Sequence, residues 1–236
     1  TKDINKNVSG IAAQSLLSNI NIDYGFEIEI NKGIKPGSGI GSSAASSAGT
    51  VFAINQLLDS PFSLLDLVKF SMEGEKFVSG AYHADNVAPI IFGGITLVRT
   101  IDDLDIIPLP TPKELEVVIV RPNIEIKTAD SRKVVKKKVK IEKMTQQSAN
   151  LGSFVSSLYS EDYDLMSRSV IDQVVEPDRA VLIPEFDKVK MISKDSGSIA
   201  AGISCSGPSI FSLSYICVTS NFLVFNIYYN FFSIDF

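Results

Sequence analysis

The feature that most constrains this chain is a glycine-rich run that leads directly into an alanine-rich segment. The run is PGSGIGSSAASSAG, from Pro36 to Gly49, and the chain continues as TVFAINQLL. Glycines at 37, 39 and 41 let the backbone turn its N–H groups inward and let an anion approach closely. The alanine-rich segment has few polar side chains, so it predicts a buried helix that begins at about Ser42, with its positive end beside the glycines.

On its own, the glycine-rich run allows two interpretations. Its amides, the helix start and the hydroxyls of Ser42 and Ser43 are the parts of a phosphate-binding loop. The Gly-Lys-Ser/Thr of a P-loop does not follow, however. A flexible turn that ends in a helix cap would use the same residues, so other parts of the chain have to decide.

Predicted helices and strands alternate irregularly around this run. Apolar spacing predicts a helix over 7–20 and a half-buried strand over 24–30, and Ser63 and Asp66 have the spacing of a capping box at the start of another helix. Further strands are predicted at GGITLV, at ELEVVIV and over GISCSGPSIFSLS, and further helices at TADSRKVVKKKV and MTQQSANLGSFVSSLY. This mixture predicts an α+β fold without a regular βαβ alternation.

Composition sets outer limits on function. The 236 residues allow one large domain or two small ones, and three prolines at 108, 110 and 112 predict a boundary there. A formal net charge of −5 argues against sequence-independent nucleic-acid binding, and valine spacing in the basic run Arg132 to Lys140 predicts a solvated helix face for most of it. Cys205 and Cys217 fit a reducing compartment and offer no metal-ligand spacing.

Both ends of the chain are unusual. It opens with Thr1 inside a helix-forming stretch, so we expect an earlier segment to be missing. The stretch 215–236 is dense in Phe, Tyr, Ile and Asn, and its only charge is Asp235. A membrane anchor is disfavoured because asparagines interrupt the stretch and no Lys or Arg flanks it. A native terminal strand or helix and translated non-coding sequence are the alternatives.

A second group of candidate residues lies in EGEKFVSGAYHADNVAP. The single histidine, His83, precedes Asp85 and Asn86 in a predicted loop. A lone histidine is usually structural, but a carboxylate and a carboxamide beside it in a loop favour a site. Glu73 and Glu75 are two residues apart on a predicted helix, so only one of them can face a given ligand.

A third loop and two arginines complete the candidates. The loop lies in GISCSGPSIFSLS, from Gly202 to Ser214, and could approach a second part of the same ligand or form a plain tight turn. Arg132 and Arg179 carry guanidinium groups, which bind carboxylates and phosphates with two parallel hydrogen bonds. Either could equally be an ordinary surface arginine.

Taken together, in this order and at these separations, the three loops resemble the GHMP kinase superfamily and, within it, the homoserine kinase branch. The resemblance rests on PGSGIGSSAAS, SGAYHADNVAP followed by GGITLVR, SCSGPSIFSLS, TADSR and EPDRAVLIPEF, and it runs from about residue 7 to 214. It implies a two-lobed α+β fold, with a βαβ-containing ATP-binding domain over 1–110, a ferredoxin-like domain over 111–214 and a divergent tail over 215–236. The implied activity is transfer of the ATP γ-phosphoryl group to the side-chain hydroxyl of L-homoserine, in threonine biosynthesis.

The resemblance also implies roles for single residues. Those implied for ATP are Pro36, Gly37, Ser38, Gly39, Ile40, Gly41, Ser42, Ser43 and Ala44. Mg²⁺ would be held by Ser43 and Glu75, and homoserine by His83, Asp85, Arg132 and Arg179. The residues implied near the reacting groups are Asn86, Glu75 and Thr128, and those of the third loop are Ser204, Ser206 and Gly207. Two arginines and one aspartate also suit a zwitterionic amino acid on chemical grounds.

The implied mechanism needs no dedicated base. Asn86 stands where mevalonate kinase-like branches carry an aspartate, and an amide cannot accept a proton as a base. Positioning and charge neutralisation would therefore carry the catalysis. The resemblance leaves a homodimer open and implies the cytoplasm, or the plastid in a plant or alga.

Three departures from the family pattern limit these expectations. An N-terminal motif with a substrate-binding asparagine is absent, Cys205 stands where the family has glycine, and nothing after Ser214 resembles the family. Another GHMP small-molecule kinase and a non-catalytic fragment are therefore the alternatives to homoserine kinase.

Overall fold

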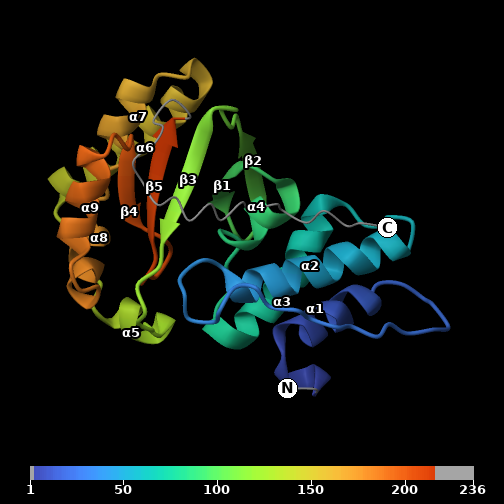
Figure 1. The fold of residues 1–236 in the computed structure, drawn as a ribbon. Coiled ribbons are helices and arrows are strands. Elements are labelled where there is room, and N and C mark those ends of the chain that lie inside the picture. The colour runs from blue at the N-terminus through green and yellow to red at the C-terminus, as the bar shows by residue number, and fades with distance from the viewer. Residues whose placement is uncertain (1–2, 216–236) are drawn as a thin grey trace. The chain divides into compact units, whose positions relative to one another are not determined.

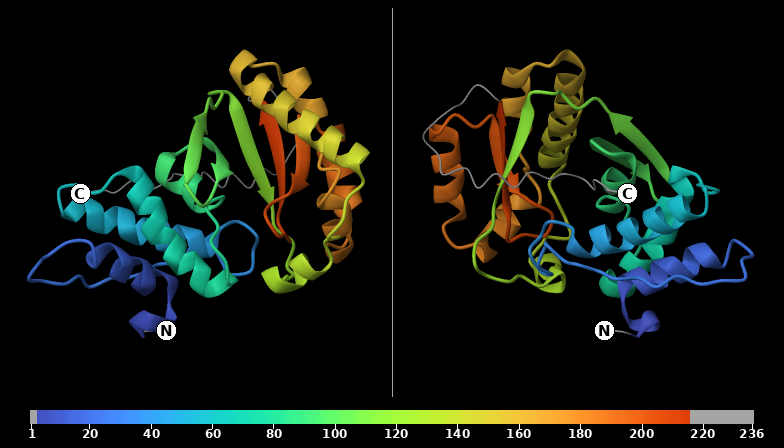
Figure 2. Two further views of the ribbon diagram at one scale, coloured as in Figure 1. Left: turned by 180° about the vertical axis from the view of Figure 1, so that it is seen from behind. Right: turned by 45° about the vertical axis from the view of Figure 1, so that its right-hand side comes forward.

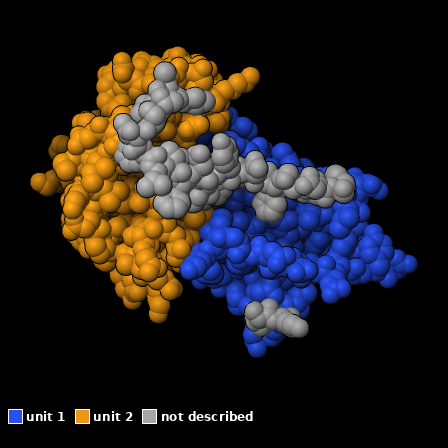
Figure 3. Space-filling view, viewed as in Figure 1, with its two compact units in different colours: residues 1–36, 41–109 blue, residues 37–40, 110–236 orange. Residues whose placement is uncertain are grey.

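The structure is a computed structural model that describes residues 3–215 (Figure 1). Contacts divide the chain into two units, which Figure 3 shows in different colours. Unit 1 comprises residues 1–36 and 41–109, and unit 2 comprises residues 37–40 and 110–236. The short segment 37–40, which holds the first two glycines of the glycine-rich run, therefore makes its contacts with unit 2.

Unit 1 consists of helices followed by a hairpin. Its elements are a 3-10 turn (Ile4–Lys6), α1 (Val8–Leu17), α2 (Ser42–Leu57), α3 (Leu64–Ser79), α4 (Val87–Phe92), β1 (Ile95–Thr100) and β2 (Asp105–Leu109). The two strands pair antiparallel, with Ile95 opposite Leu109. The helices predicted over 7–20, from Ser42 and after Ser63 are confirmed, and so is the strand at GGITLV.

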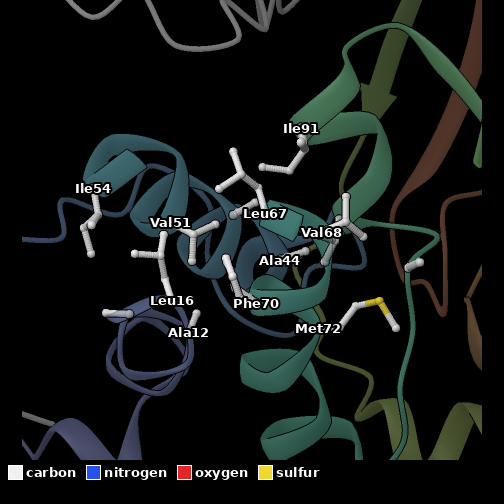
Figure 4. Packing of buried hydrophobic residues seen from close by; sticks show 14 of the residues in the cluster. Ala12, Leu16, Ala44, Val51, Ile54, Leu67, Val68, Phe70, Met72 and Ile91 are labelled. Atoms are coloured by element: carbon white, nitrogen blue, oxygen red, sulfur yellow. The ribbon is translucent and has the colours of Figure 1, made fainter. Parts of the chain in front are cut away.

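The core of unit 1 lies where α1, α2 and α3 meet (Figure 4). Ala44, Ala48 and Val51 of α2 are fully buried, together with Leu16 of α1 and Leu67 of α3. Small side chains at a helix interface let the neighbouring backbones approach closely, which the alanine-rich composition of α2 permits. The sequence prediction of a buried helix is therefore correct.

Helix α3 begins and ends where the sequence signals it. The Ser63 hydroxyl accepts a hydrogen bond from the backbone N–H of Asp66, and the Asp66 carboxylate accepts one from the N–H of Ser63. This is the predicted capping box. At the other end, Gly80 adopts a left-handed conformation with φ of 76°. The helix therefore stops there, and the chain turns into the segment that carries His83.

Unit 2 contains a three-stranded antiparallel sheet in the order β3-β5-β4. Its elements are β3 (Leu115–Val120), α5 (Thr128–Lys133), α6 (Ile141–Ser160), α7 (Tyr163–Ser169), α8 (Glu176–Arg179), a 3-10 turn (Ala180–Leu182), α9 (Phe186–Asp195), β4 (Ala200–Ile203) and β5 (Ile210–Tyr215). Helices α7 and α9 contact β4, and together with α6 they cover one face of the sheet (Figure 2). The predicted strand at LEVVIV is confirmed as β3.

Three local predictions are wrong. The segment 24–30 forms no strand, because a strand needs a partner for its backbone groups and none of the described residues pairs with it. Of its apolar side chains, Phe26 packs against the core of unit 1, while Tyr24 and Ile30 are exposed.

The other two errors lie in unit 2. The basic run is not mainly helical: α5 ends at Lys133, and residues 134–140 have neither helix nor strand. Adjacent valines and clustered lysines, which repel one another, disfavour a continuing helix. The segment GISCSGPSIFSLS forms two strands, β4 and β5, rather than one strand, and the loop that was also predicted within it is confirmed as residues 204–209.

The C-terminal stretch is mostly outside the described part of the chain. Tyr215 ends β5, and the alternatives considered for 216–236 concern residues that the structure does not describe. Among the helices of the described part, none combines the length and the apolarity needed to cross a membrane.

Candidate active site

The glycine-rich run forms a loop whose glycines have left-handed backbones. Gly37, Gly39 and Gly41 have φ angles of 72°, 74° and 76°. Gly41 is the N-cap of α2, a helix of 16 residues. Left-handed backbone conformations at alternate positions can direct neighbouring backbone N–H groups toward the same side of a loop. The start of the helix adds partial positive charge. The local geometry is therefore suited to an anion.

Serine side chains of the third loop, residues 204–209, hold the glycine-rich loop by hydrogen bonds to the backbone carbonyl groups of the glycine-rich loop. Within unit 2, the Ser204 hydroxyl donates to the carbonyl of Gly39 at 2.8 Å, and the Ser209 hydroxyl donates to the carbonyl of Ser38 at 2.6 Å. A Cβ on Gly39 would lie 2.3 Å from the carbonyl oxygen of Gly207, so no other residue fits there. These contacts occupy carbonyl oxygens and use none of the N–H groups of the glycine-rich loop.

Cys205 is accommodated in the third loop without a break in these contacts. Its φ is 53°, and its side chain is exposed. A left-handed backbone costs a residue with a Cβ about 1–2 kcal/mol, which glycine avoids. The departure from the family pattern therefore costs some stability but leaves the loop in place.

A hydroxyl and a carboxylate meet just inside the start of α2. The Ser43 hydroxyl donates to Oε2 of Glu75 on α3 at 3.0 Å. Glu75 is only 7% exposed, and its Oε1 is buried without a hydrogen-bond partner in the described part of the chain. Glu73, two residues earlier, instead accepts a hydrogen bond from the Tyr82 hydroxyl at 2.8 Å. The prediction that these two glutamates point in different directions is confirmed.

The environment of Glu75 suits a hard cation. Burial raises the pKa of its carboxyl group, and the nearby carboxylate of Asp85 acts in the same direction, while the Ser43 hydrogen bond and Lys32 oppose them. Mg²⁺ binds one or two carboxylates, prefers oxygen ligands and keeps waters and phosphate oxygens for its other positions. A buried carboxylate with one uncommitted oxygen and a hydroxyl beside it fits such an ion. The described residues hold no cluster of three or more His, Cys, Asp and Glu for a fully protein-ligated metal.

Asn86 brings the histidine-bearing segment to the start of α2. It directly precedes α4, and its side chain makes no capping hydrogen bond to that helix. Its Oδ1 lies 3.8 Å from the position that a Cβ on Gly41 would occupy. The amide of Asn86 is therefore next to the end of the glycine-rich loop, and both residues belong to unit 1.

His83 and Asp85 line a cavity of about 590 Å³ in unit 1. The other lining residues are Ala84, Val98, Arg99, Thr100, Ile101 and Asp102. The Thr100 hydroxyl is buried and has no hydrogen-bond partner in the described part of the chain. Sequence reasoning did not include the end of β1 in the site, because strand residues carry no signal of what lies opposite them.

The remaining candidates lie in unit 2, where two of them connect to the third loop. Arg179 ends α8, and its Nη1 donates to the carbonyl of Cys205 at 2.7 Å, while its Nε is buried without a partner among the described residues. Thr128 and Arg132 are exposed on α5. The buried Ser131, next to Arg132, donates its hydroxyl to the carbonyl of Ser206 at 2.8 Å. Sequence reasoning missed Ser131, since nothing in TADSR distinguishes a buried serine from an exposed one.

The predicted residues therefore fall into two groups. In unit 1 the structure brings together the start of α2, Glu75 and the segment 83–86. In unit 2 it brings together the segment 37–40, the third loop, α5 and Arg179.

Comparisons with known proteins match both units. The family model for the GHMP kinases N terminal domain matches residues 7–94, and the model for GHMP kinases C terminal matches residues 154–215. The crystal structure of homoserine kinase from Cytophaga hutchinsonii is 45% identical, with a TM-score of 0.88 over 91% of this chain and 68% of that chain.

Curated homoserine kinases have a similar sequence identity to this chain. That of Chlorobium phaeobacteroides is 39% identical over 215 residues, which is 89% of this chain and 67% of the relative. That of Chloroherpeton thalassium is 44% identical over 189 residues, 80% of this chain and 59% of the relative. The chain thus spans 59% to 67% of the length of these curated relatives. By these matches the chain belongs to the GHMP kinase superfamily and, within it, to the homoserine kinases.

Proposed function

We propose that the protein transfers the γ-phosphoryl group of ATP to the side-chain hydroxyl of L-homoserine, giving ADP and O-phospho-L-homoserine. The observation that carries this proposal is the meeting of two segments within unit 1. The amide of Asn86 lies beside Gly41. Two residues after Gly41, the hydroxyl of Ser43 on α2 donates a hydrogen bond to Glu75 on α3. The segment that we propose for the acceptor, the helix start that we propose for phosphate and the carboxylate that we propose for Mg²⁺ are therefore neighbours.

ATP is the co-substrate of a kinase of this family, and its phosphates would lie on the loop from Pro36 to Ala44. The N–H groups of the glycine-rich loop and the positive end of α2 would stabilise their charge. Ser43 and Glu75 would hold Mg²⁺, which when bound neutralises charge on the β- and γ-phosphate oxygens. The unpartnered Oε1 of Glu75 supports this assignment.

For the amino-acid substrate we propose His83, Asp85, Arg132 and Arg179, with Thr128 close to the reacting groups. Guanidinium groups would bind the carboxylate of homoserine, and the carboxylate of Asp85 would bind its ammonium group. The cavity lined by His83 and Asp85 supports their part of this assignment.

The reaction itself needs orientation more than it needs a base. The homoserine hydroxyl oxygen attacks the γ-phosphorus, a new P–O bond forms, and the bond to the β-phosphate oxygen breaks. The transition state is loose, so the hydroxyl proton leaves late and passes to an oxygen of the transferred phosphoryl group or to water, and the amide of Asn86 would orient the hydroxyl without accepting that proton. Ser204, Ser206 and Gly207 would act by holding the nucleotide loop in shape.

In keeping with the two units of the chain, we also propose that residues 1–110 serve as the ATP-binding domain and 111–214 as the C-terminal domain. We place the protein in a reducing compartment such as the cytoplasm, because cysteine usage gives no disulfide framework.

A coupled ADP-release assay on the protein expressed from its complete gene tests the function. We expect ADP release that depends on both Mg²⁺ and L-homoserine. Comparable activity on mevalonate, galactose or shikimate without activity on homoserine would overturn the substrate. Absence of turnover on every alcohol, with MgATP binding retained in calorimetry, would indicate a non-catalytic nucleotide-binding protein instead.

A further inference from the structure

Two segments that carry the proposed substrate arginines are both attached to the third loop. Ser131, which precedes Arg132, donates its hydroxyl to the carbonyl of Ser206 at 2.8 Å. Arg179 donates from Nη1 to the carbonyl of Cys205 at 2.7 Å. One loop thus connects α5 and α8, and both connections lie within unit 2.

Asp178 adds a direct connection between the same two segments. Its Oδ2 accepts a hydrogen bond from the backbone N–H of Lys136 at 2.9 Å, and its Oδ1 lies 2.9 Å from the Nζ of Lys136. The Asp178 side chain is 9% exposed, whereas that of Lys136 is 75% exposed. The side-chain hydrogen bond from Lys136 is the main cause that lowers the pKa of Asp178, so this carboxyl group is ionised at neutral pH.

The segment that Asp178 holds has little structure of its own. Lys136 lies in the stretch 134–140, which follows α5, has neither helix nor strand and is largely exposed. Arg132 is four residues earlier, near the end of α5. A six-residue helix is too short to be stable by itself, so the direction of α5 depends on what holds its two ends.

The partner side of the contact is firmly held. The carboxylate of Asp172 accepts hydrogen bonds from the N–H groups of Val174 and Val175, each at 2.8 Å, and from that of Glu176 at 3.0 Å. These bonds satisfy backbone donors at the start of α8, as a capping carboxylate does. These hydrogen bonds therefore hold the start of the helix that carries Asp178 and Arg179.

We propose that Asp178 is a positioning residue that sets the guanidinium group of Arg132 relative to that of Arg179. Its carboxylate fixes the backbone at Lys136 and thereby the end of α5, while its own helix carries Arg179. The role rests on the proposed function, in which both arginines bind the substrate carboxylate. In this role Asp178 acts through its contacts to Lys136 and not through a contact of its own to substrate or nucleotide.

The backbone hydrogen bond separates this role from an ordinary surface ion pair. An exposed ion pair contributes little, and removing Lys136 Nζ leaves the hydrogen bond from its N–H to Asp178 intact. Lys136→Ala should therefore have a small effect, while Asp178→Ala removes both contacts. Asp130→Ala is the matched control, since Asp130 pairs with Lys133 at the same distance of 2.9 Å but within one turn of α5.

The experiment is steady-state kinetics on the protein expressed from its complete gene. For Asp178→Ala we expect the KM for L-homoserine to rise by about 10-fold to 100-fold, as for a small misplacement of a binding group, with the KM for ATP unchanged. Lys136→Ala and Asp130→Ala should stay within about twofold of wild type, because exposed pairs are weak. Adding Asp178→Ala to Arg132→Ala should cause no further rise, since the group to be positioned is gone.

The outcomes separate this inference from the proposed function. If the wild-type protein does not phosphorylate homoserine, the proposed function fails. If it does, and Asp178→Ala leaves the KM for homoserine at the level of the Asp130→Ala control, the positioning role is refuted. A fall in kcat alone, or equal changes in both KM values, also refutes it. Should Asp178→Ala not fold, Asp178→Leu has a similar side-chain shape but cannot accept the hydrogen bond from the Lys136 N–H, and the same selective rise in KM is expected of it.

Discussion

The two parts of the candidate site are held in place by different means. Around the nucleotide loop, glycines with positive φ, fully buried alanines of α2 and short hydroxyl–carbonyl bonds fix the backbone. Around the arginines, a six-residue helix and a four-residue helix are held by side-chain contacts to backbone groups and by an ion pair. The proposed phosphate-binding part is therefore specified by backbone geometry together with hydroxyl groups that are distant in sequence, whereas the proposed substrate-binding part relies mainly on side-chain contacts.

The largest effect expected from this difference is at Gly39. Gly39→Ala would place a Cβ 2.3 Å from the carbonyl oxygen of Gly207, and position 39 itself has a left-handed backbone that disfavours alanine. The substitution should therefore lower the free energy of unfolding by about 2–5 kcal/mol and abolish tight ATP binding. Urea unfolding and calorimetry with MgATP measure both. Gly152→Ala is the control: no atom lies within 4 Å of its new Cβ on α6, and it should stabilise by roughly 0.5–1 kcal/mol.

Glu75 is the next most sensitive position. Glu75→Gln keeps the shape of the side chain but removes the charge that would hold Mg²⁺, so kcat should fall by about 100-fold or more. Varying the Mg²⁺ concentration in the activity assay checks the cause. A variant with wild-type kcat and wild-type Mg²⁺ dependence would show that Glu75 holds no ion.

The raised pKa of Glu75 predicts that the free energy of unfolding depends on pH in the absence of Mg²⁺. Burial raises the pKa of Glu75 above its usual 4.5, so the folded state holds this proton more tightly than the unfolded state does. The stabilisation from protonated Glu75 is complete below pH 4.5 and is lost as pH rises through the raised pKa. The stability of Glu75→Gln relative to wild type should therefore increase across that window, and a constant difference would contradict the raised pKa.

Two serines test whether the two parts of the site are separate. Ser204 donates to the carbonyl of Gly39, and Ser131 donates to the carbonyl of Ser206, both at 2.8 Å. Because a buried hydrogen bond is worth about 1 kcal/mol, Ser204→Ala should raise the KM for ATP about fivefold, and Ser131→Ala the KM for homoserine by a similar factor. If both variants raise the same KM, the division between the two parts is wrong.

The smallest expected effect is at Cys205. Glycine relieves the strain of its left-handed backbone but makes the unfolded chain more flexible, so Cys205→Gly should change the free energy of unfolding by no more than about 1 kcal/mol. Thermal unfolding measures it. A loss of several kcal/mol would mean that the cysteine side chain makes a structural contribution of its own.

The sequence predicted the local geometry around the glycine-rich run better than the contacts around the two arginines. Glycines at 37, 39 and 41, the helix from Ser42 and the capping box at Ser63 all depend on neighbours close in sequence. Such local signals can be read from a single chain. The opposite directions of Glu73 and Glu75 followed from helix geometry in the same way.

What depended on distant partners could not be predicted. The strand expected over 24–30 has no pairing partner among the described residues, and the alternation of its side chains could not reveal that. The spacing of the neighbouring valines predicts a helix at Lys136. In the structure, its backbone N–H instead donates a hydrogen bond to the carboxylate of Asp178, 42 residues away in sequence. Ser131 and Asp178 look like surface residues until the fold places their partners beside them.

The most direct test of the central claim is phosphorus NMR of the reaction mixture. The protein expressed from its complete gene is incubated with MgATP and L-homoserine, and the spectrum is compared with that of a sample lacking homoserine. We predict a new phosphate monoester resonance that grows in step with ADP and requires homoserine. Formation of inorganic phosphate alone, or no change with homoserine, would contradict the account.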